Sequence, residues 1–442
     1  MKLQAIKVVK FGGSSLADAE HFTKAVEIVK ADKSRRYVVP SAPGRRFSGD
    51  GKVTDMLYDC YDKAARGDGD IDTLFAPIAA RYNDIIRDLH LNLTLGAEFD
   101  RIKGAFVHKA GRDYAASRGE YLNGRIMAAC TGFDFIDAAD VIFFREDGTF
   151  DAERTNTVLG EELKKHEYAV IPGFYGSMPN DTIKTFSRGG SDITGSIVAR
   201  AADCELYENW TDVSGFMMAD PRVVPDPLPI DTVTYRELRE LSYMGATVLH
   251  DEAIFPVRVA GIPINIRNTN RPADKGTMIV PACPDDSPRN VITGIAGKKG
   301  FSVVTIEKDM MNAELGFGRK VLQVFETNGI SFEHLPSGID TMSVIVASAA
   351  IESRREKILS EISDAVHPDT VFIDDKLCLV AVVGRNMRNV VGTLARVTTA
   401  IAAAGISIRT VDQGSSEMNI ILGVREKDFE SAINAIYAEF VK

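Results

Sequence analysis

The sequence predicts an α/β protein in which a mostly parallel sheet lies between helical layers and is followed by two smaller ferredoxin-like modules. Apolar strands alternate with amphipathic helices through the first part of the chain, which is typical of a parallel sheet. The last part contains an ungapped repeat, because Gly405-Ile406-Ser407 follows Gly329-Ile330-Ser331 by 76 positions. Each copy has the order strand, loop, helix, strand, strand, helix, which we interpret as the βαββαβ unit of a ferredoxin-like module. We therefore expect domains at 1–285, 290–370 and 371–442, with strands open to exchange between the last two.

Composition narrows the functional classes. The 442 residues are 45% hydrophobic and 26% charged, as in a globular protein, and carry a formal net charge of -10. This charge argues against a broad binding surface for nucleic acid or an anionic membrane. The five cysteines are scattered without CxxC or metal-ligand spacing, which predicts reduced thiols and no protein-bound metal site. No apolar run has the length of a membrane span or the pattern of a signal peptide, so we expect a cytoplasmic protein.

The first chemical motif is a glycine-rich turn after the first strand. Residues 5–10 predict a strand, Gly12-Gly13-Ser14-Ser15 a turn, and the apolar stripe at Phe22, Ala25, Val26 and Val29 a helix. Such a turn directs backbone N–H groups at an anion, and Lys10 adds a full charge. No P-loop or dinucleotide fingerprint is present, and an ordinary βα turn remains an alternative.

The next segments carry less chemical information. Residues 37–39 predict a second strand, which ends at Pro40-Ser41-Ala42-Pro43-Gly44. Residues 45–52 are polar and predict a flap, and Thr54 opens a helix. Residues 70–106 predict helices that face the surface.

Glu120 is a candidate ligand for a substrate amine. Arg118-Gly119-Glu120 leads into a helix whose apolar face includes Leu122 and Ile126, so we expect Glu120 in the first turn of that helix. A carboxylate there is favoured by the helix dipole alone. The alternative is that Glu120 holds a substrate ammonium.

A second glycine-rich turn carries an arginine. Residues 170–174 and 182–186 predict strands, and Ser187-Arg188-Gly189-Gly190-Ser191-Asp192 leads into a helix that Ser191 or Asp192 could cap. Arginine binds a carboxylate through two parallel hydrogen bonds, and the paired glycines leave room for a ligand. This pattern favours a binding site for a small acid over a plain cap.

A third motif follows the strand at residues 205–210. Thr211 and Asp212 stand at its carboxyl end, where ligands meet a parallel sheet, and Asp220-Pro221-Arg222 follows. Residues 235–244 predict a helix, and the strand at 263–266 is expected to close the domain. His250 in the intervening stretch is interpreted as a structural histidine.

With these motifs together, the chain resembles the aspartokinases. The matching stretches are Lys10 to Ser15, Ser187 to Asp192, and Trp210-Thr211-Asp212-Val213 through Arg222. The resemblance implies an amino acid kinase fold with two C-terminal ACT modules. It also implies phosphorylation of the aspartate side chain by ATP with Mg²⁺, as the first step of lysine, threonine and methionine biosynthesis.

The resemblance also implies roles for individual residues. Lys10 and Asp192 would be catalytic, with Lys10 on the transferring phosphoryl group. The nucleotide would contact Lys10, Gly12, Gly13, Ser14, Thr211, Asp212, Met217, Asp220 and Arg222. Aspartate would contact Ser41, Thr54, Glu120, Phe174, Arg188, Gly189, Gly190 and Ser191, with Arg188 on the α-carboxylate and Glu120 towards the amine. An effector, lysine or threonine, would bind near Gly316, Phe317, Glu333 and His334.

Two positions depart from the family pattern. Many relatives have a tyrosine where this chain has Met217, and many have a lysine where it has Thr247. Because the residues on the phosphate side are intact, we interpret both as features of a subfamily.

Other functions remain open at this point. One is a kinase acting on another acceptor, such as glutamate, and another is an amino-acid sensor that keeps the kinase fold without turnover. The ACT modules also imply a homodimer or homotetramer, and no role for nucleic acid or membrane is expected.

Overall fold

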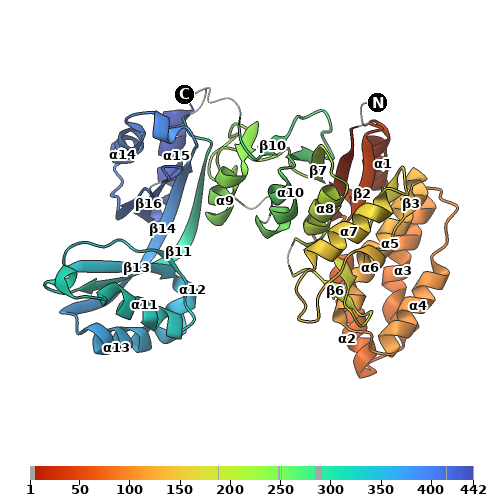
Figure 1. Cartoon of the computed structure of the whole chain (residues 1–442), viewed down its shortest axis with the longest axis horizontal. Helices are drawn as coiled ribbons and strands as arrows, with labels where there is room; N and C mark the ends of the chain where they lie inside the picture. Colours follow the sequence, from red (N-terminus) through yellow and green to blue (C-terminus); the bar gives the residue numbers. More distant parts are fainter. Residues whose placement is uncertain are drawn as a thin grey trace. The chain divides into compact units, whose positions relative to one another are not determined.

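The computed structural model describes residues 5–187, 189–246, 249, 251–283, 291–414 and 416–441 (Figure 1). The chain divides into two compact units. The first comprises Met1–Phe216, Pro229–Tyr235 and Thr247–Cys283, and the second comprises Met217–Leu228, Arg236–Ala246 and Pro284–Lys442. Among the described helices, none has the length and apolarity needed to cross a membrane.

The first unit is built on an eight-stranded sheet in the order β3-β4-β2-β1-β7-β9-β10-β8. In that order the strands are Asp134–Phe135, Ala169–Val170, Arg35–Pro40, Lys7–Phe11, Leu206–Thr211, Ile264–Asn268, Thr277–Val280 and Thr232–Thr234. From β3 to β9 every pair is parallel, and β10 runs antiparallel to β9. The central strands are almost continuously buried, as expected for a parallel sheet covered on both faces.

The helices of this unit pack on the sheet and on each other. They are Ala19–Lys30 (α1), Val53–Arg66 (α2), Ile71–Asp88 (α3), Gly96–Val107 (α4), Arg112–Thr131 (α5), Ala138–Val141 (α6), Ala152–Leu163 (α7), Gly190–Ala201 (α8) and Phe255–Ala260 (α10). Helix α8 contacts β1, β2 and β7, whereas α2 to α5 pack together. The helices predicted within residues 70–106 are present as α3 and α4, but they do not face only the surface. Helices α3 and α4 bury aromatic side chains such as Phe75, Tyr82 and Phe106, which contact one another or neighbouring rings.

Two strand predictions also need correction. The strand predicted at 170–174 ends at Val170, and the chain then turns through Phe174, whose φ is +83°. Tyr175–Ser177 (β5) and Ile183–Thr185 (β6) instead form a separate antiparallel pair. The strand predicted at 263–266 is present as β9, but it is not the last strand of the domain, because β10 follows it in the chain within the first unit. Strands of two to four residues are too short to give a clear alternation in sequence.

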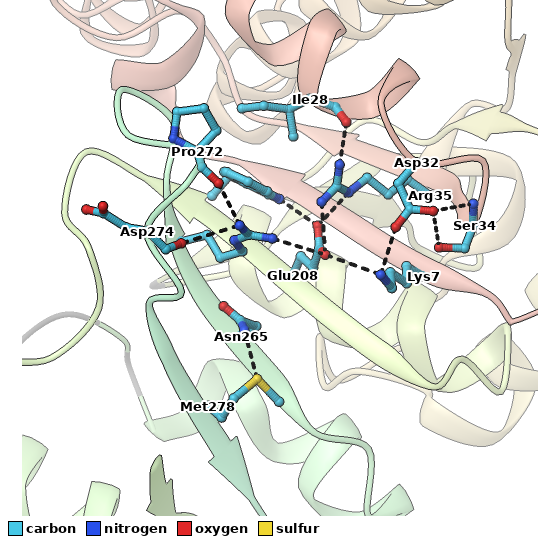
Figure 2. A network of polar contacts seen from close by, with 12 residues as sticks. Lys7, Ile28, Asp32, Ser34, Arg35, Glu208, Asn265, Pro272, Asp274 and Met278 are labelled. Atoms are coloured by element: carbon cyan, nitrogen blue, oxygen red, sulfur yellow. Dashed lines mark hydrogen bonds and ion pairs between the residues drawn. The ribbon is translucent and has the colours of Figure 1, made fainter. Parts of the chain in front are cut away.

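A buried ionic network ties the central strands together (Figure 2). The carboxylate of Glu208 on β7 accepts hydrogen bonds from Arg35 Nε at 2.8 Å and from Trp210 Nε1 at 2.9 Å. Lys7 Nζ lies 3.9 Å from the same carboxylate and 2.8 Å from Asp32. Opposite charges from β1, β2 and β7 therefore satisfy one another inside the unit.

The second unit contains a six-stranded antiparallel sheet in the order β12-β13-β11-β14-β16-β15. In that order the strands are Phe332–His334, Thr341–Ala347, Gly294–Glu307, Thr370–Val383, Asn419–Arg425 and Thr410–Asp412. Its helices are Phe317–Thr327 (α11), Ser348–Ile351 (α12), Arg355–Val366 (α13), Thr393–Ala403 (α14) and Phe429–Phe440 (α15). Helix Tyr235–Tyr243 (α9) also belongs to this unit, apart from Tyr235, which is the last residue of a segment of the first unit. Helices α11 and α14 begin 76 residues apart and have equal length, which confirms the repeat.

The two halves of this sheet share their long strands. β11 and β14 are each 14 residues long and pair from Gly294 opposite Val383 to Glu307 opposite Thr370. Residues 301–307 of β11 also pair with β13, whereas residues 377–383 of β14 pair with β16. Each long strand therefore serves both copies of the repeat.

Candidate active site

The turn after β1 is fixed by close backbone contacts. The Gly44 N–H donates to the Gly13 carbonyl at 2.8 Å. A Cβ atom on Gly13 would lie 2.9 Å from the Ala42 carbonyl oxygen, so a side chain does not fit there. The buried Ser15 and Thr269 hydroxyls lie 2.8 Å apart and anchor the other side of the turn. The turn is therefore preorganised before any ligand binds.

Lys10 and Asp192 form an ion pair beside this turn. Lys10 Nζ lies 2.6 Å from Asp192 Oδ1, and the amide of Asn209 on β7 donates to the same oxygen at 2.9 Å. Lys10 is buried. The prediction that Ser191 or Asp192 caps α8 was wrong: the N-cap is Gly189, with φ of +58°, and no side chain caps this end. Asp192 is held towards Lys10 instead.

Glu120 lies in the middle of a helix. Helix α5 begins at Arg112, so the first-turn position and its dipole explanation were wrong. The Glu120 side chain is buried, and burial raises the pKa of its carboxyl to about 8, against the opposing effect of a hydrogen bond from the Ala42 N–H. Its Oε2 has no hydrogen-bond partner among the described residues. A buried polar atom without a partner is costly and points to a ligand.

These elements enclose a pocket of about 650 Å³. Of the predicted site residues, it is lined by Gly13, Ser14, Ser41, Thr54, Glu120, Phe174, Gly190, Ser191 and Asp212. The structure thus brings together residues from the turn after β1, the loop after β2, helix α5 and the start of α8. Lys10 and Asp192 are not part of this lining, but Lys10 precedes the turn that contains Gly13, and Asp192 follows Ser191 directly in the chain.

The remaining predicted residues are distributed differently. Gly12 is the N-cap of the short 3-10 helix Gly13–Leu16 that follows β1. The Thr211 hydroxyl donates to Asp212 Oδ1 at 3.1 Å. Met217, Asp220 and Arg222 belong to the second unit. There Arg222 Nη2 lies 2.6 Å from Asp220, and this hydrogen bond lowers the pKa of the Asp220 carboxyl. Arg188, Thr247 and His250 lie outside the described residues.

The effector residues predicted in the second unit also lie at element ends. Gly316 is the N-cap of α11, with φ of +79°, and Phe317 is its buried first residue. Glu333 and His334 lie on β12. His334 Nδ1 lies 2.7 Å from Asp412 Oδ2 on β15, and the Tyr243 hydroxyl on α9 donates to Glu333 Oε2.

Sequence reasoning missed the contribution of the loop after β2. Arg45, Phe47, Ser48 and Lys52 line the pocket, and the loop is held by an ionic contact from Arg81 on α3 to Asp50 at 2.6 Å. Hydrogen bonds from Arg46 and then Arg81 hold the pKa of the Asp50 carboxyl well below its usual range. The cluster of cations between residues 45 and 52 was the available signal. Its partner Arg81 is too distant in sequence to be recognised.

Comparison with known proteins places the chain in a family. Residues 5–268 match the amino acid kinase family and residues 380–440 match the ACT domain. Aspartokinase 3 of Bacillus subtilis is 38% identical, with 98% of each chain covered. A bifunctional aspartokinase/homoserine dehydrogenase of Haemophilus influenzae is 29% identical over 98% of this chain and 56% of its own length.

Solved structures agree. The aspartate kinase of Clostridium acetobutylicum is 47% identical and superposes with a TM-score of 0.91, covering 99% of this chain and 100% of its own. Escherichia coli aspartokinase III, in complex with aspartate and ADP, has the same fold at 22% identity, with a TM-score of 0.74 and coverage of 99% and 100%. The amino acid kinase fold, the ACT modules and these full-length relatives together show that the chain belongs to the aspartokinase family, the ATP-dependent kinases of the aspartate side-chain carboxylate that are regulated through ACT domains.

Proposed function

We propose that the pocket between the turn after β1 and Glu120 holds aspartate with its side-chain carboxylate facing the γ-phosphate of ATP. One observation carries this assignment: the pocket joins a turn suited to phosphate with the buried, unpartnered Oε2 of Glu120. Glu120 receives the substrate ammonium, which supplies the missing hydrogen bonds. Arg188, from the motif that adjoins Gly190, binds the α-carboxylate.

Phosphoryl transfer in this site requires positioning and charge neutralisation. An oxygen of the aspartate side chain forms a bond to the γ-phosphorus, while the bond from that phosphorus to the bridging oxygen breaks and ADP leaves with the electron pair. The attacking carboxylate is already ionised at neutral pH, so no general base is required. Lys10 neutralises charge on the transferring group, and Asp192 with Asn209 orients its ammonium.

The nucleotide is expected to use the phosphate side of the pocket. Gly12, Gly13 and Ser14 offer backbone N–H groups to phosphate oxygens, and Thr211 and Asp212 stand at the end of β7. The family resemblance also assigns Met217, Asp220 and Arg222 to the nucleotide; these three residues belong to the second unit, and their role stays a prediction.

The carboxylate and phosphate oxygens of this site suit magnesium that is bound together with ATP. Magnesium in kinases is held by one or two carboxylates together with phosphate oxygens and water, and the exposed Asp212 offers one such carboxylate in the pocket. When bound, the ion would neutralise phosphate charge during transfer.

The second unit is proposed to bind the feedback effector near Gly316, Phe317, Glu333 and His334. Lysine is the first effector to test, with threonine as the alternative, because E. coli aspartokinase III has the same fold and was solved in complex with lysine and aspartate. Association of two or four chains through the ACT modules belongs to the same proposal.

The proposal is tested by ADP release from MgATP with aspartate, with glutamate, or without an acceptor, each with and without lysine or threonine. Aspartate-dependent release suppressed by one effector is expected. Lys10→Ala should lower kcat by about 10²–10³, as the loss of one transition-state donor does. Lys24→Ala on α1, which breaks only an exposed pair with Glu20, should leave kcat unchanged. Wild-type turnover in Lys10→Ala would contradict the assigned role.

A further inference from the structure

The loop after β2 carries two cations to the acceptor pocket. Arg45 and Lys52 both line the pocket that Glu120 and Thr54 also line. Both side chains are exposed, and neither has a hydrogen bond or ion pair with any residue that the structure describes. Neighbouring charged groups in the same loop are, by contrast, fully engaged.

A buried arginine fixes this loop in place. Arg81 is only 5% exposed; its Nη1 donates to Asp50 Oδ2 at 2.6 Å and its Nη2 to the Gly44 carbonyl at 2.6 Å. The Arg46 side chain makes two further hydrogen bonds to Asp50, at 2.9 and 3.0 Å, and its backbone N–H makes a third at 3.0 Å. Asp50 is thus shared by Arg81 and Arg46. The loop is therefore anchored at residues that lie between Arg45 and Lys52. The side chains of Arg45 and Lys52 themselves make no polar contact with a described residue that would stabilise the loop, so their position beside the pocket is not explained by the fold.

The charges of the reaction call for further cations at this position. The acceptor brings two carboxylates, and the transferring phosphoryl group brings more negative oxygens. The described cation of the phosphate turn, Lys10, is already matched by Asp192 at 2.6 Å. Asp212 and the ionised form of Glu120 add negative charge to the pocket lining. The acceptor carboxylates and the phosphoryl oxygens therefore need further positive charges in the pocket, from cations that are not already paired with a protein carboxylate.

We propose that Arg45 and Lys52 bind the anionic oxygens of the acceptor, either those of its carboxylate before transfer or those of the phosphoryl group that it receives. This inference rests on the acceptor pocket proposed above. It adds two residues to the site and makes Arg81 and Asp50 positioning residues that hold the loop carrying them.

Charge-removing variants test the inference. Arg45→Gln, Lys52→Gln and the double variant are compared with Lys63→Gln and Arg66→Gln, which remove exposed, paired charges from helix α2, the helix that follows the loop. We expect the double variant to lose at least tenfold in kcat/KM for aspartate without a change in melting temperature. Lys52→Arg, which keeps the charge, should retain much of the activity that Lys52→Gln loses. The controls should match the wild type.

Two measurements separate the possible anions. If the pair holds the carboxylate, calorimetric titration with aspartate in the absence of nucleotide should show weaker binding in the double variant. If it holds the phosphoryl group, aspartate affinity should be unchanged and kcat should fall. Either result supports the inference, and values within twofold of wild type in both assays would overturn it.

Glu120→Gln distinguishes failure of this inference from failure of the acceptor pocket itself. A raised aspartate KM in Glu120→Gln, together with wild-type behaviour of the double variant, would reject Arg45 and Lys52 and keep the pocket. Wild-type behaviour of both would reject the pocket and the inference with it.

Discussion

At the residue scale, the role proposed for Glu120 predicts that aspartate binding depends on pH. Its carboxyl is buried, so the pKa is raised from 4.5 to about 8 in the empty protein. Below pH 8 the group is mostly protonated and cannot pair with an ammonium. In the proposed role only the ionised fraction would bind aspartate well, and that fraction rises up to about tenfold per pH unit below the pKa.

We therefore expect the KM for aspartate to fall as pH rises from 6 to 8 and then to level off. Steady-state kinetics at a series of pH values measures this, and Glu120→Gln should have a higher KM with a flat profile. The same shift acts on stability: the native state binds the extra proton, so unfolding free energy should decrease as pH rises from about 4.5 to 8. An aspartate KM independent of pH in the wild type would contradict this role of Glu120.

Gly190 is required by the ring of Phe174. A Cβ atom on Gly190 would lie 2.1 Å from Phe174 Cδ2, which is far inside van der Waals contact, so the ring or the start of α8 would have to move. Gly190→Ala should therefore displace the ring within the pocket and raise the KM for aspartate at least tenfold. Gly104→Ala on α4 is the matched control, since a Cβ there meets no atom within 4 Å. Equal KM values in the two variants would refute the packing argument.

At the element scale, the strands of the first unit depend on the Glu208 network (Figure 2). Glu208→Gln would leave the buried Arg35 guanidinium without its carboxylate partner. Breaking a buried pair in this way costs about 3–5 kcal/mol. Urea unfolding monitored by the fluorescence of Trp210, the single tryptophan, measures the loss.

An exposed pair provides the comparison. Asp59→Asn removes the surface pair with Lys63 on α2, which should cost only about 0.3–0.5 kcal/mol. Equal losses in the two variants would mean that the Glu208 network contributes no more than a surface pair does.

Helix α9 makes a polar contact with each half of the sheet of the second unit. The Tyr243 hydroxyl donates to Glu333 on β12, and the Asn419 amide on β16 donates to Glu240 at 2.6 Å. Burial, and then the bond to Glu333, raises the pKa of Tyr243 to about 12, so the hydroxyl remains a donor at neutral pH. An effector that engages Glu333 would change this contact.

At the scale of the whole molecule, we expect the contact between Tyr243 and Glu333 to matter for regulation if the effector binds at Glu333, because α9 follows β8 of the first unit directly in the chain. Tyr243→Phe should shift the effector concentration for half-inhibition at least threefold, while kcat without effector stays unchanged. Inhibition curves with lysine and threonine measure the shift. Tyr168→Phe, which alters a ring stacked on Phe133 in the first unit, is the control. An unchanged inhibition curve in Tyr243→Phe would exclude the contact from regulation.

Local motifs made much of this molecule predictable. The turn after Lys10, the end of β7 at Thr211 and the 76-residue repeat were recognised because each signal is contained in a short stretch or in an exact offset. The position of Glu120 in the middle of α5 was not recognised. That helix buries residues on every side, including Arg118 and Glu120, so it shows no amphipathic stripe from which its start could be read.

The sequence by itself determined the α/β class, the two repeated modules and the family, because these depend on periodicity and motif, and the family resemblance then indicated many of the residues that line the pocket. Only the tertiary structure decided the long-range pairs: Lys10 with Asp192, Arg35 with Glu208, and Arg81 with Asp50. Their partners are separated by 31 to 182 residues, and no local pattern encodes such a distance. The charge state of Glu120 was likewise decided by burial, which is a property of the folded chain.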